Sequence, residues 1–264
     1  MDCGAESSSG TGNFLSRLWD CFHENLEIVA GSYWGLSARD ERVQDQAHWC
    51  GVLRWPRERW TAYGDFHVGY ALDLLDRFAG PDFTADLKQK TALEWGCGGG
   101  ANVRCLCNAF ARVYGLDISA DTLDACGRQM RNHGLSNFIP VLIPAEEPRA
   151  VLRTAPSGSV DFILSIAVFQ HFPSKPYTRR VLKAMEALLK KNGLALIQVR
   201  YFDGSEKYRQ KDGDYAKNVI TMTSFTFDEF SQHLRQAGLK LLHAEKDIER
   251  EGLCHEYYFI RKEA

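Results

Sequence analysis

The pattern of hydrophobic and polar positions changes near residue 90 and divides the chain into two parts. Residues 14–79 read as mostly helical, and Gly80-Pro81 ends that part because neither residue continues a helix well. After residue 90, short apolar runs alternate with amphipathic stretches, which predicts strands alternating with helices. Such alternation is typical of a parallel sheet with helices on both of its faces.

The apolar runs predict five parallel strands, at residues 91–95, 112–116, 138–143, 160–166 and 194–199. Helices are expected at residues 101–110, 119–133, 175–191 and 227–237, and a closing antiparallel strand pair at residues 239–247 and 256–261. Asn192-Gly193 is expected to end the third of these helices. The run 160–166 is almost entirely apolar, as a strand covered on both faces requires.

Composition is that of an ordinary globular protein. Hydrophobic residues make up 45% and charged residues 25% of the 264 positions, enough for one domain with an attached cap. The net charge of −2 gives no overall attraction to nucleic acid or membrane, and no apolar run is long enough to span a bilayer. The opening MDCGAESSSGTGN has no secretory apolar core, and the eight cysteines form no C-x-x-C pair, so a cytoplasmic location with free thiols and no bound metal is expected.

The most informative stretch is residues 92–102, ALEWGCGGGAN, where four glycines crowd one turn after an apolar run. Glycine is needed where a chain turns sharply and its backbone must come close to a ligand. The spacing Gly96-x-Gly98-x-x-Ala101 also satisfies the dinucleotide fingerprint, which keeps an NAD(P)-dependent oxidoreductase open as an alternative. Glu94 favours a cofactor with a cationic group instead, because a carboxylate beside a pyrophosphate would repel it.

A second acidic position, Asp117, lies 21 residues after Gly96 at the end of an apolar strand. A carboxylate there can accept hydrogen bonds from both hydroxyls of a ribose, as any adenosine cofactor requires. The alternative is a loop acid that caps the following helix.

Glu94-x-Gly96-x-Gly98-x-Gly100 resembles the first motif of class I S-adenosylmethionine (SAM) methyltransferases. VYGLDIS at 113–119 and SVDFILSIAVFQHF at 159–172 are similar to the second and fourth motifs, and the resemblance covers about residues 90–262. It implies a doubly wound, seven-stranded, mostly parallel α/β sheet, with SAM as cofactor and S-adenosylhomocysteine (SAH) as product. The cofactor-binding residues that it implies are Glu94, Gly96, Cys97, Gly98, Gly100, Asp117, Ile118, Ala145, Glu146, Ser165 and Ile166. The third motif of the family falls on IPAEE at 143–147, where Pro144 stands at a position that is often acidic in the family. The contact with the adenine edge then falls to Ala145 or Glu146. The alternative is that this segment is a plain surface loop.

His171 is the candidate catalytic residue, since it follows the strand whose end should face the reacting methyl group. An imidazole can take a proton from a hydroxyl or an ammonium near neutral pH. The alternative is that His171 only packs and orders its turn. Substrate contacts are expected from Trp60, Tyr63, His67, Gln170, Arg200 and Tyr201.

The domain prediction is a disordered tail at 1–12, an N-terminal helical lid at 13–85, and a SAM-binding domain at 86–264 with a cap insertion at about 201–225. The basic and aromatic insertion suits an anionic or aromatic small molecule, although an ordinary solvated loop has the same composition. The expected activity is methyl transfer to oxygen or nitrogen of a small molecule, with no nucleic-acid or membrane partner and with the oligomeric state left open. A methyltransferase-like binding or activator module without activity is the alternative from another class.

Overall fold

The computed structural model describes residues 26–51, 54–211, 213–247 and 254–263. In this part of the chain seven strands form one sheet: β1 (Thr91–Trp95), β2 (Arg112–Asp117), β3 (Phe138–Leu142), β4 (Val160–Ser165), β5 (Leu189–Arg200), β6 (Leu239–Asp247) and β7 (His255–Lys262). Their order is β3-β2-β1-β4-β5-β7-β6. The pairs among β1 to β5 are parallel, and β7 is antiparallel to both of its neighbours. The predicted fold class is confirmed; the predicted disordered tail at 1–12 lies outside the described residues.

Eight named α-helices accompany the sheet in the same residues: α2 (Glu41–Gln46), α3 (Arg57–Ala79), α4 (Pro81–Ala85), α5 (Ala101–Ala109), α6 (Ala120–Asn132), α7 (Lys175–Leu188), α8 (Tyr215–Asn218) and α9 (Phe227–Ala237). Residues 26–34 are helical as well. Short 3₁₀ turns are η1 (Leu87–Gln89), η2 (Pro148–Arg153), η3 (Phe169–His171), η4 (Glu206–Tyr208) and η5 (Val219–Thr221). Among the described residues, no helix is both long enough and apolar enough to cross a membrane.

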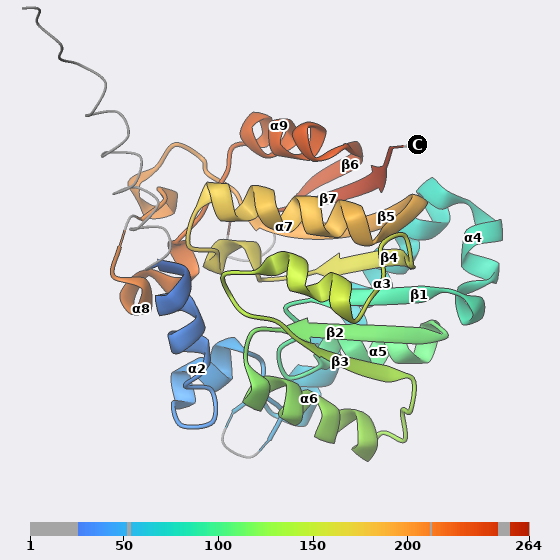
Figure 1. The fold of residues 1–264 in the computed structure, drawn as a ribbon, viewed down its shortest axis with the longest axis horizontal. Helices are drawn as coiled ribbons and strands as arrows, with labels where there is room; N and C mark the ends of the chain where they lie inside the picture. Colours follow the sequence, from blue (N-terminus) through green and yellow to red (C-terminus); the bar gives the residue numbers. More distant parts are fainter. Residues whose placement is uncertain (1–25, 52–53, 212, 248–253, 264) are drawn as a thin grey trace, which may run out of the picture.

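The two faces of the sheet carry separate hydrophobic cores, because side chains alternate along each strand. On β4, Phe162 and Leu164 join the core that contains the buried residues of α3, α5 and α6. Ile163 joins the opposite core, which contains the buried residues of α7 and α9. Figure 1 shows α7 in front of the strands, α9 next to β6, and α3 partly hidden behind the sheet. The helices therefore cover both faces, as a doubly wound sheet requires.

Polar side chains begin the helices where the sequence places them. The Ser119 hydroxyl accepts a hydrogen bond from the Thr122 amide at 3.3 Å, which fixes the start of α6 after β2. Thr226 and Glu229 form a capping box at the start of α9, and Gly238 ends it at φ +82°. These local signals position the strand ends that precede α6 and follow α9.

Helix α7 ends three residues earlier than the sequence pattern predicts. The helix stops at Leu188, and β5 begins at Leu189, which pairs with Val160 and is fully buried. Asn192, at φ +62°, lies inside the irregular start of β5 and does not end the helix. Strand pairing and burial of an apolar side chain outweigh the helix propensity of a basic pair, which only tertiary contacts reveal.

The described N-terminal part of the chain divides between two positions. Helix α3 packs on a face of the sheet against α5, while residues 26–51 lie at the edge toward which the arrows of β2 and β4 point (Figure 1). The Gly99 amide donates to the Ala47 carbonyl at 2.6 Å, and the hydroxyls of Ser37 and Ser119 are 2.8 Å apart. Residues 26–51 therefore cover the carboxyl ends of the parallel strands.

Candidate functional site

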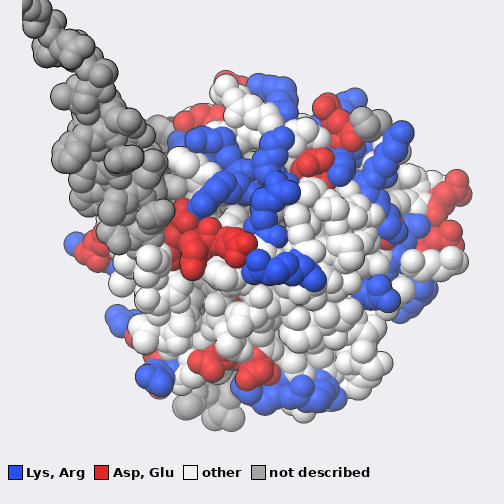
Figure 2. Space-filling view, in the orientation of Figure 1, with Lys and Arg blue, Asp and Glu red and all other residues white. Residues whose placement is uncertain are grey.

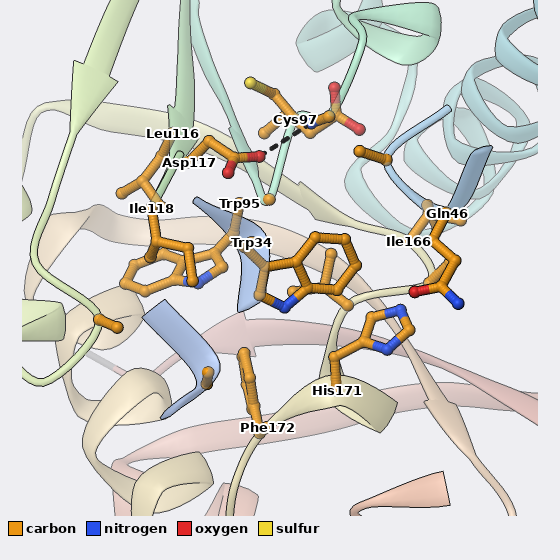
Figure 3. A pocket seen from close by; sticks show the side chains of 18 of the residues that line it. Trp34, Gln46, Trp95, Cys97, Leu116, Asp117, Ile118, Ile166, His171 and Phe172 are labelled. Carbon is orange, nitrogen blue, oxygen red and sulfur yellow. Dashed lines mark hydrogen bonds between the residues drawn. The ribbon is translucent and has the colours of Figure 1, made fainter. Parts of the chain in front are cut away.

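A cavity opens at the carboxyl ends of β1, β2 and β4, with an open volume of about 880 Å³ including its mouth. Open α/β sheets bind ligands at this edge. The sheet side of the cavity is formed by Glu94, Trp95, Gly96, Cys97, Gly98, Ala101, Asn102, Leu116, Asp117, Ile118, Ala145 and Ile166. The rest of the lining comes from Glu27, Ala30, Trp34, Gln46, Ala47, His48, Ala167, Val168, His171, Phe172, Pro173, Tyr177 and Tyr215. Figure 3 shows Asp117 and His171 on opposite sides, with Trp34 between them.

The glycine loop after β1 turns in the left-handed region that glycine tolerates best. Gly96, Gly98 and Gly100 have φ values of +74°, +50° and +89°. A Cβ atom on Gly98 would meet the Ala47 carbonyl oxygen at 2.5 Å, and one on Gly99 would collide with the His48 carbonyl oxygen. The close approach that excludes side chains at these two positions therefore comes from the chain's own residues 47–48.

Glu94 is a buried carboxyl group at the end of β1. It accepts a hydrogen bond from Asn102 Nδ2 at 2.7 Å through Oε1, while its Oε2 and the Asn102 Oδ1 have no partner among the described residues. Burial raises the pKa of Glu94 to about 8, so the carboxyl group is largely protonated at neutral pH. Two unpartnered acceptors on one wall of a cavity suit a ligand with a cationic donor.

Asp117, at the end of the adjacent strand β2, holds the loop with both of its oxygens. Oδ2 accepts from the Gly98 amide at 3.1 Å, drawn as the dashed line in Figure 3, and Oδ1 accepts from the Ser119 amide at 3.0 Å. Burial raises the pKa of Asp117 to about 6. Each carboxylate oxygen accepts more than one hydrogen bond, so both retain capacity for a ligand hydroxyl. The helix-capping alternative falls to Ser119 instead.

His171 lies in η3, the turn that follows β4. Its Nδ1 is 2.7 Å from the Val219 carbonyl oxygen, which can only accept, so Nδ1 carries the proton. Nε2 is then the acceptor of the ring, and the Gln170 side-chain amide nitrogen lies 3.4 Å from it. The Trp34 ring packs edge-on against the imidazole with centroids 5.1 Å apart. Burial lowers the pKa of His171 to about 4, so the ring is neutral at physiological pH.

Comparison with known proteins agrees with this geometry. Residues 93–197 match the family described as a methyltransferase domain. The ubiquinone biosynthesis O-methyltransferase of Bordetella avium is 27% identical over 145 residues, which span 54% of this chain and about half, 54%, of that relative. The protein of the same name from Bordetella bronchiseptica is 25% identical over 199 residues, 72% of this chain and 76% of the relative. Residues 93–197 thus match a methyltransferase domain, and the fold of the chain is that of the class I SAM-dependent methyltransferases.

Solved structures share the fold of this chain at low sequence identity. Magnesium protoporphyrin IX methyltransferase from Synechocystis PCC 6803, solved with SAH, superposes with a TM-score of 0.61 at 11% identity, covering 89% of this chain and 99% of that one. The 1,6-didemethyltoxoflavin-N1-methyltransferase of Burkholderia thailandensis gives 0.54 at 18% identity, with 81% and 93% covered. The [4+2]-cyclase SpnF gives 0.55 at 14% identity, with 74% and 80% covered, so the fold alone does not specify methyl transfer.

Most of the residues predicted to bind cofactor come together at the cavity. Those that line it are Glu94, Gly96, Cys97, Gly98, Asp117, Ile118, Ala145 and Ile166. Three others do not. Gly100 packs against Cys126 as the first residue before α5, Glu146 is exposed, and the Ser165 hydroxyl donates to the Trp95 carbonyl inside the sheet.

None of the six residues predicted to contact substrate lines the cavity, whereas the catalytic candidate His171 does. Trp60 is fully buried on the α5 face, between the Arg104 guanidinium and the His133 ring. Its aromatic stretch lies in α3, which packs on the sheet face and not over the sheet edge. The apolar side chain of Trp60, which the sequence assigns to a lid over the site, is therefore part of the hydrophobic core.

The five other predicted contacts lie outside the cavity wall. Tyr63 packs edge-on against the wall residue His48, with centroids 4.5 Å apart, and Tyr63 in turn contacts His67. Gln170 is buried beside His171, and Arg200 is buried at the end of β5. Tyr201 pairs with Phe225 and carries the Lys246 ammonium 3.7 Å from its ring centroid.

Sequence reasoning missed the aromatic wall opposite the strand ends. Trp34, Phe172 and Tyr215 come from three separate segments, and the Trp34 Nε1 donates to the Tyr215 hydroxyl at 3.0 Å. The Tyr215 hydroxyl donates in turn to the His171 carbonyl at 2.6 Å. The sequence shows that the 201–225 insertion is rich in tyrosine, but no local signal indicates which tyrosine faces the sheet edge.

A second hollow lies on the surface beside α7 and has mixed charge. Figure 2 shows basic side chains gathered over the upper half of this face, with an acidic group directly below them. Lining residues of both signs, Arg179, Arg180, Lys183, Glu146 and Glu147, account for this pattern. No three His, Cys, Asp or Glu side chains in the described part of the chain are placed to hold a metal ion.

Proposed function

We propose that the cavity binds SAM and that the protein transfers the SAM methyl group to an oxygen or nitrogen of a small-molecule acceptor. The observation that carries this proposal is the pair of buried carboxyl groups, Glu94 and Asp117, at adjacent strand ends on one cavity wall. Asp117 has acceptor capacity for two ribose hydroxyls. Glu94 and Asn102 offer unpartnered oxygens to the ammonium of the methionyl part. The residues present therefore fit this cofactor.

The remaining wall suits the adenine and argues against a dinucleotide. Ile118 and Ala145 supply apolar surface next to Asp117. A pyrophosphate bound over the glycine loop would lie beside Glu94, which could then remain only in its protonated form, whereas an ammonium at the same place attracts the ionised carboxylate. The position of the carboxyl group therefore favours SAM over NAD(P).

SAM supplies an activated methyl group, and the protein must align the acceptor, exclude water and remove a proton. The His171 Nε2 electron pair is the proposed acceptor for that proton, since Nδ1 is held by the Val219 carbonyl. Trp34, Phe172 and Tyr215 provide the apolar surroundings that keep water away. Residues 26–51 would then form the lid over the bound cofactor. This lid is smaller than the one that the sequence predicts at residues 13–85.

The acceptor is proposed to be small because the chain's own segments form the wall opposite the strand ends. Relatives at 25–27% identity are named ubiquinone biosynthesis O-methyltransferases, which favours a hydroxyl group as the methylated position. The fold neighbours from Synechocystis and Burkholderia thailandensis are also named for small-molecule methylation. These names support the class of acceptor and leave its identity open.

Calorimetry with SAH and with NAD(P), combined with the substitution Asp117→Ala, tests the proposal. The unchanged protein should bind SAH and should not bind NAD(P). Loss of hydrogen bonds worth roughly 1.5–3 kcal/mol each to a charged group predicts at least tenfold weaker SAH binding in Asp117→Ala. Asp124→Ala, an exposed acid in α6, is the matched control and should change affinity less than twofold.

Two results would contradict the proposal. Binding of NAD(P) without binding of SAH would assign the cavity to an oxidoreductase. Tight SAH binding without consumption of SAM, across a panel of hydroxylated and amino aromatic acceptors, would favour the binding-module alternative.

A further inference from the structure

Arg200, the last residue of β5, is a buried cation that has no anionic partner among the described residues. It is only 3% exposed, yet no described residue forms an ion pair with it or accepts a hydrogen bond from its guanidinium group. Its Nε is among the buried donors that have no partner in the described residues. Burying a charged group without a counter-charge costs several kcal/mol, so proteins seldom retain one that has no role.

No described carboxylate is among the groups that influence the charge of Arg200. The guanidinium carbon lies 5.7 Å from the centroid of the buried Tyr208 ring. The groups that influence its charge are the Tyr208 phenol and the Cys254 thiol, and burial lowers the pKa of Arg200. Burial raises the pKa of the Cys254 thiol, so this thiol is uncharged at neutral pH and does not balance the guanidinium charge.

A short chain of contacts connects this arginine to the proposed proton acceptor. His255 is the cross-strand partner of Arg200, and cross-strand partners project from the same face of a sheet. His255 Nε2 is 2.8 Å from Gln170 Oε1, and Gln170 Nε2 is 3.4 Å from His171 Nε2. Arg200 therefore lies behind Gln170 and His171 on the side of the site farthest from the glycine loop. Its charge also contributes to lowering the pKa of His171.

We propose that Arg200 binds an oxyanion, a carboxylate or a phosphate, carried by the methyl acceptor on an arm that extends past His171. The inference rests on the proposed function, since it names the substrate class of that same site. The planar guanidinium fork matches both oxyanions bidentately, and a buried site strengthens such a pair. The aromatic residues Trp34, Phe172 and Tyr215 on the cavity wall suit an aromatic ring as the body of the acceptor.

Binding of three simple probes tests the proposal without knowledge of the natural acceptor. Benzoate, phenyl phosphate and the neutral analogue benzamide are titrated into the full chain, both free and saturated with SAH. We expect at least one anion to bind roughly tenfold or more tightly than benzamide, in keeping with a charge-assisted hydrogen bond. The anion that binds more tightly identifies the oxyanion.

The variant Arg200→Gln should abolish the preference for anions while leaving SAH affinity within twofold. Arg200→Lys retains the charge without the fork and should keep part of the preference; it also replaces Arg200→Gln if that variant does not fold. Lys207→Gln is the matched control, because Lys207 is an exposed cation 5.0 Å from the same Tyr208 ring. That control should bind all three probes like the unchanged protein.

The outcomes separate this inference from the proposed function. Equal binding of anions and benzamide, or an anion preference that survives in Arg200→Gln, would overturn the role of Arg200. So would a loss of thermal stability in both Arg200 variants with unchanged anion preference, which would make the residue structural. Failure of SAH to bind would instead contradict the proposed function, and anion binding to the free protein would still be measured independently.

Discussion

The imidazole of His171 is held in one tautomer by a single backbone carbonyl, and its environment sets the pH range in which it can act. With a pKa of about 4, the ring is neutral at every pH above that value. It can accept a proton across the physiological range, although as a weaker base than a solvent-exposed histidine.

We expect the variant His171→Asn to lower kcat by roughly 10²–10⁴ while SAH affinity stays nearly unchanged. Asparagine can still donate to the Val219 carbonyl, so the turn is preserved. The pH–rate profile of the unchanged enzyme should lose activity near pH 4, well below the ordinary histidine range, because protonation removes the Nε2 electron pair. His243→Asn, outside the cavity, serves as control. A rate for His171→Asn within threefold of the parent would assign this residue a purely structural role.

Asp117 has a structural role in the glycine loop in addition to its proposed role in cofactor binding. Its oxygens accept the Gly98 and Ser119 amides, so it shapes the glycine loop in addition to any contact with a ribose. A substitution of Asp117 removes the hydrogen bonds to the loop amides as well as the ribose contact, so the loop geometry must be measured together with the SAH affinity. Hydrogen exchange at residues 96–100 provides that check.

The glycine loop and residues 26–51 form one contact system at the scale of secondary structure elements. The 2.6 Å hydrogen bond from Gly99 to Ala47 joins a β1 loop to a segment about fifty positions earlier in the chain. Trp49 reaches across to the Thr122 hydroxyl at 3.4 Å, and Glu27 forms an ion pair with Arg180 of α7. A lid that shares its contacts with the cofactor loop should respond to ligand binding there.

We expect Gly99→Ala to weaken SAH binding through the lid. The added methyl group would collide with the His48 carbonyl oxygen, and residues 47–49 would have to move away from the loop. Hydrogen exchange in residues 26–51 should be faster in this variant, whereas SAH should slow exchange there in the unchanged protein. Gly69→Ala is the control, because a Cβ on that α3 residue meets nothing within 4 Å. Unchanged exchange in Gly99→Ala would count against the coupling.

The contact between residues 47–48 and the glycine loop also changes what a substitution at Gly98 would test. A side chain at this position was expected to clash with the ligand, but it would first meet the Ala47 carbonyl oxygen. Loss of SAH binding in Gly98→Val would therefore report displacement of residues 26–51 as much as direct obstruction of the cofactor.

For the whole molecule, buried ionisable groups link stability to pH with opposite signs. The pKa of Glu94 is raised to about 8, so its contribution to stability is complete below its unfolded value of 4.5 and is lost as the pH rises toward 8. Asp117 behaves likewise up to about pH 6. The pKa values of His171 and His48 are lowered to about 4 and about 3, so their contributions are lost as the pH falls below 6.5.

Above pH 6.5 only the Glu94 contribution still changes among these four groups. We therefore expect the free protein to lose on the order of 1–2 kcal/mol of stability between pH 6.5 and 8, which corresponds to a Tm lower by roughly 2–6 °C. Differential scanning calorimetry should show this loss, and Glu94→Gln, which cannot titrate, should not. In the SAH complex the loss should shrink, because an ammonium beside Glu94 favours its ionised form. Equal pH dependence in the parent and Glu94→Gln would contradict the raised pKa.

The sequence by itself determined the elements and the strand ends that carry the cofactor chemistry. Apolar runs, glycine spacing and capping residues act over a few positions, so β1 at 91–95, α9 at 227–237 and β6 at 239–247 were predicted with their observed bounds. Glu94 and Asp117 follow from the same local signals, because the end of a parallel strand is defined by the residues that form it.

Only the tertiary structure decided which other side chains face the cavity. Trp60 and Trp34 both lie in an aromatic N-terminal region, yet the first is core and the second is cavity wall. Their difference depends on α3 packing against α5 and on contacts such as that between Ser37 and Ser119, which are 82 positions apart. Local propensity carries no information about such pairings, since their free energy comes from packing between distant segments. For the same reason, only the folded chain shows that Arg200 is buried and lacks an anionic partner among the described residues.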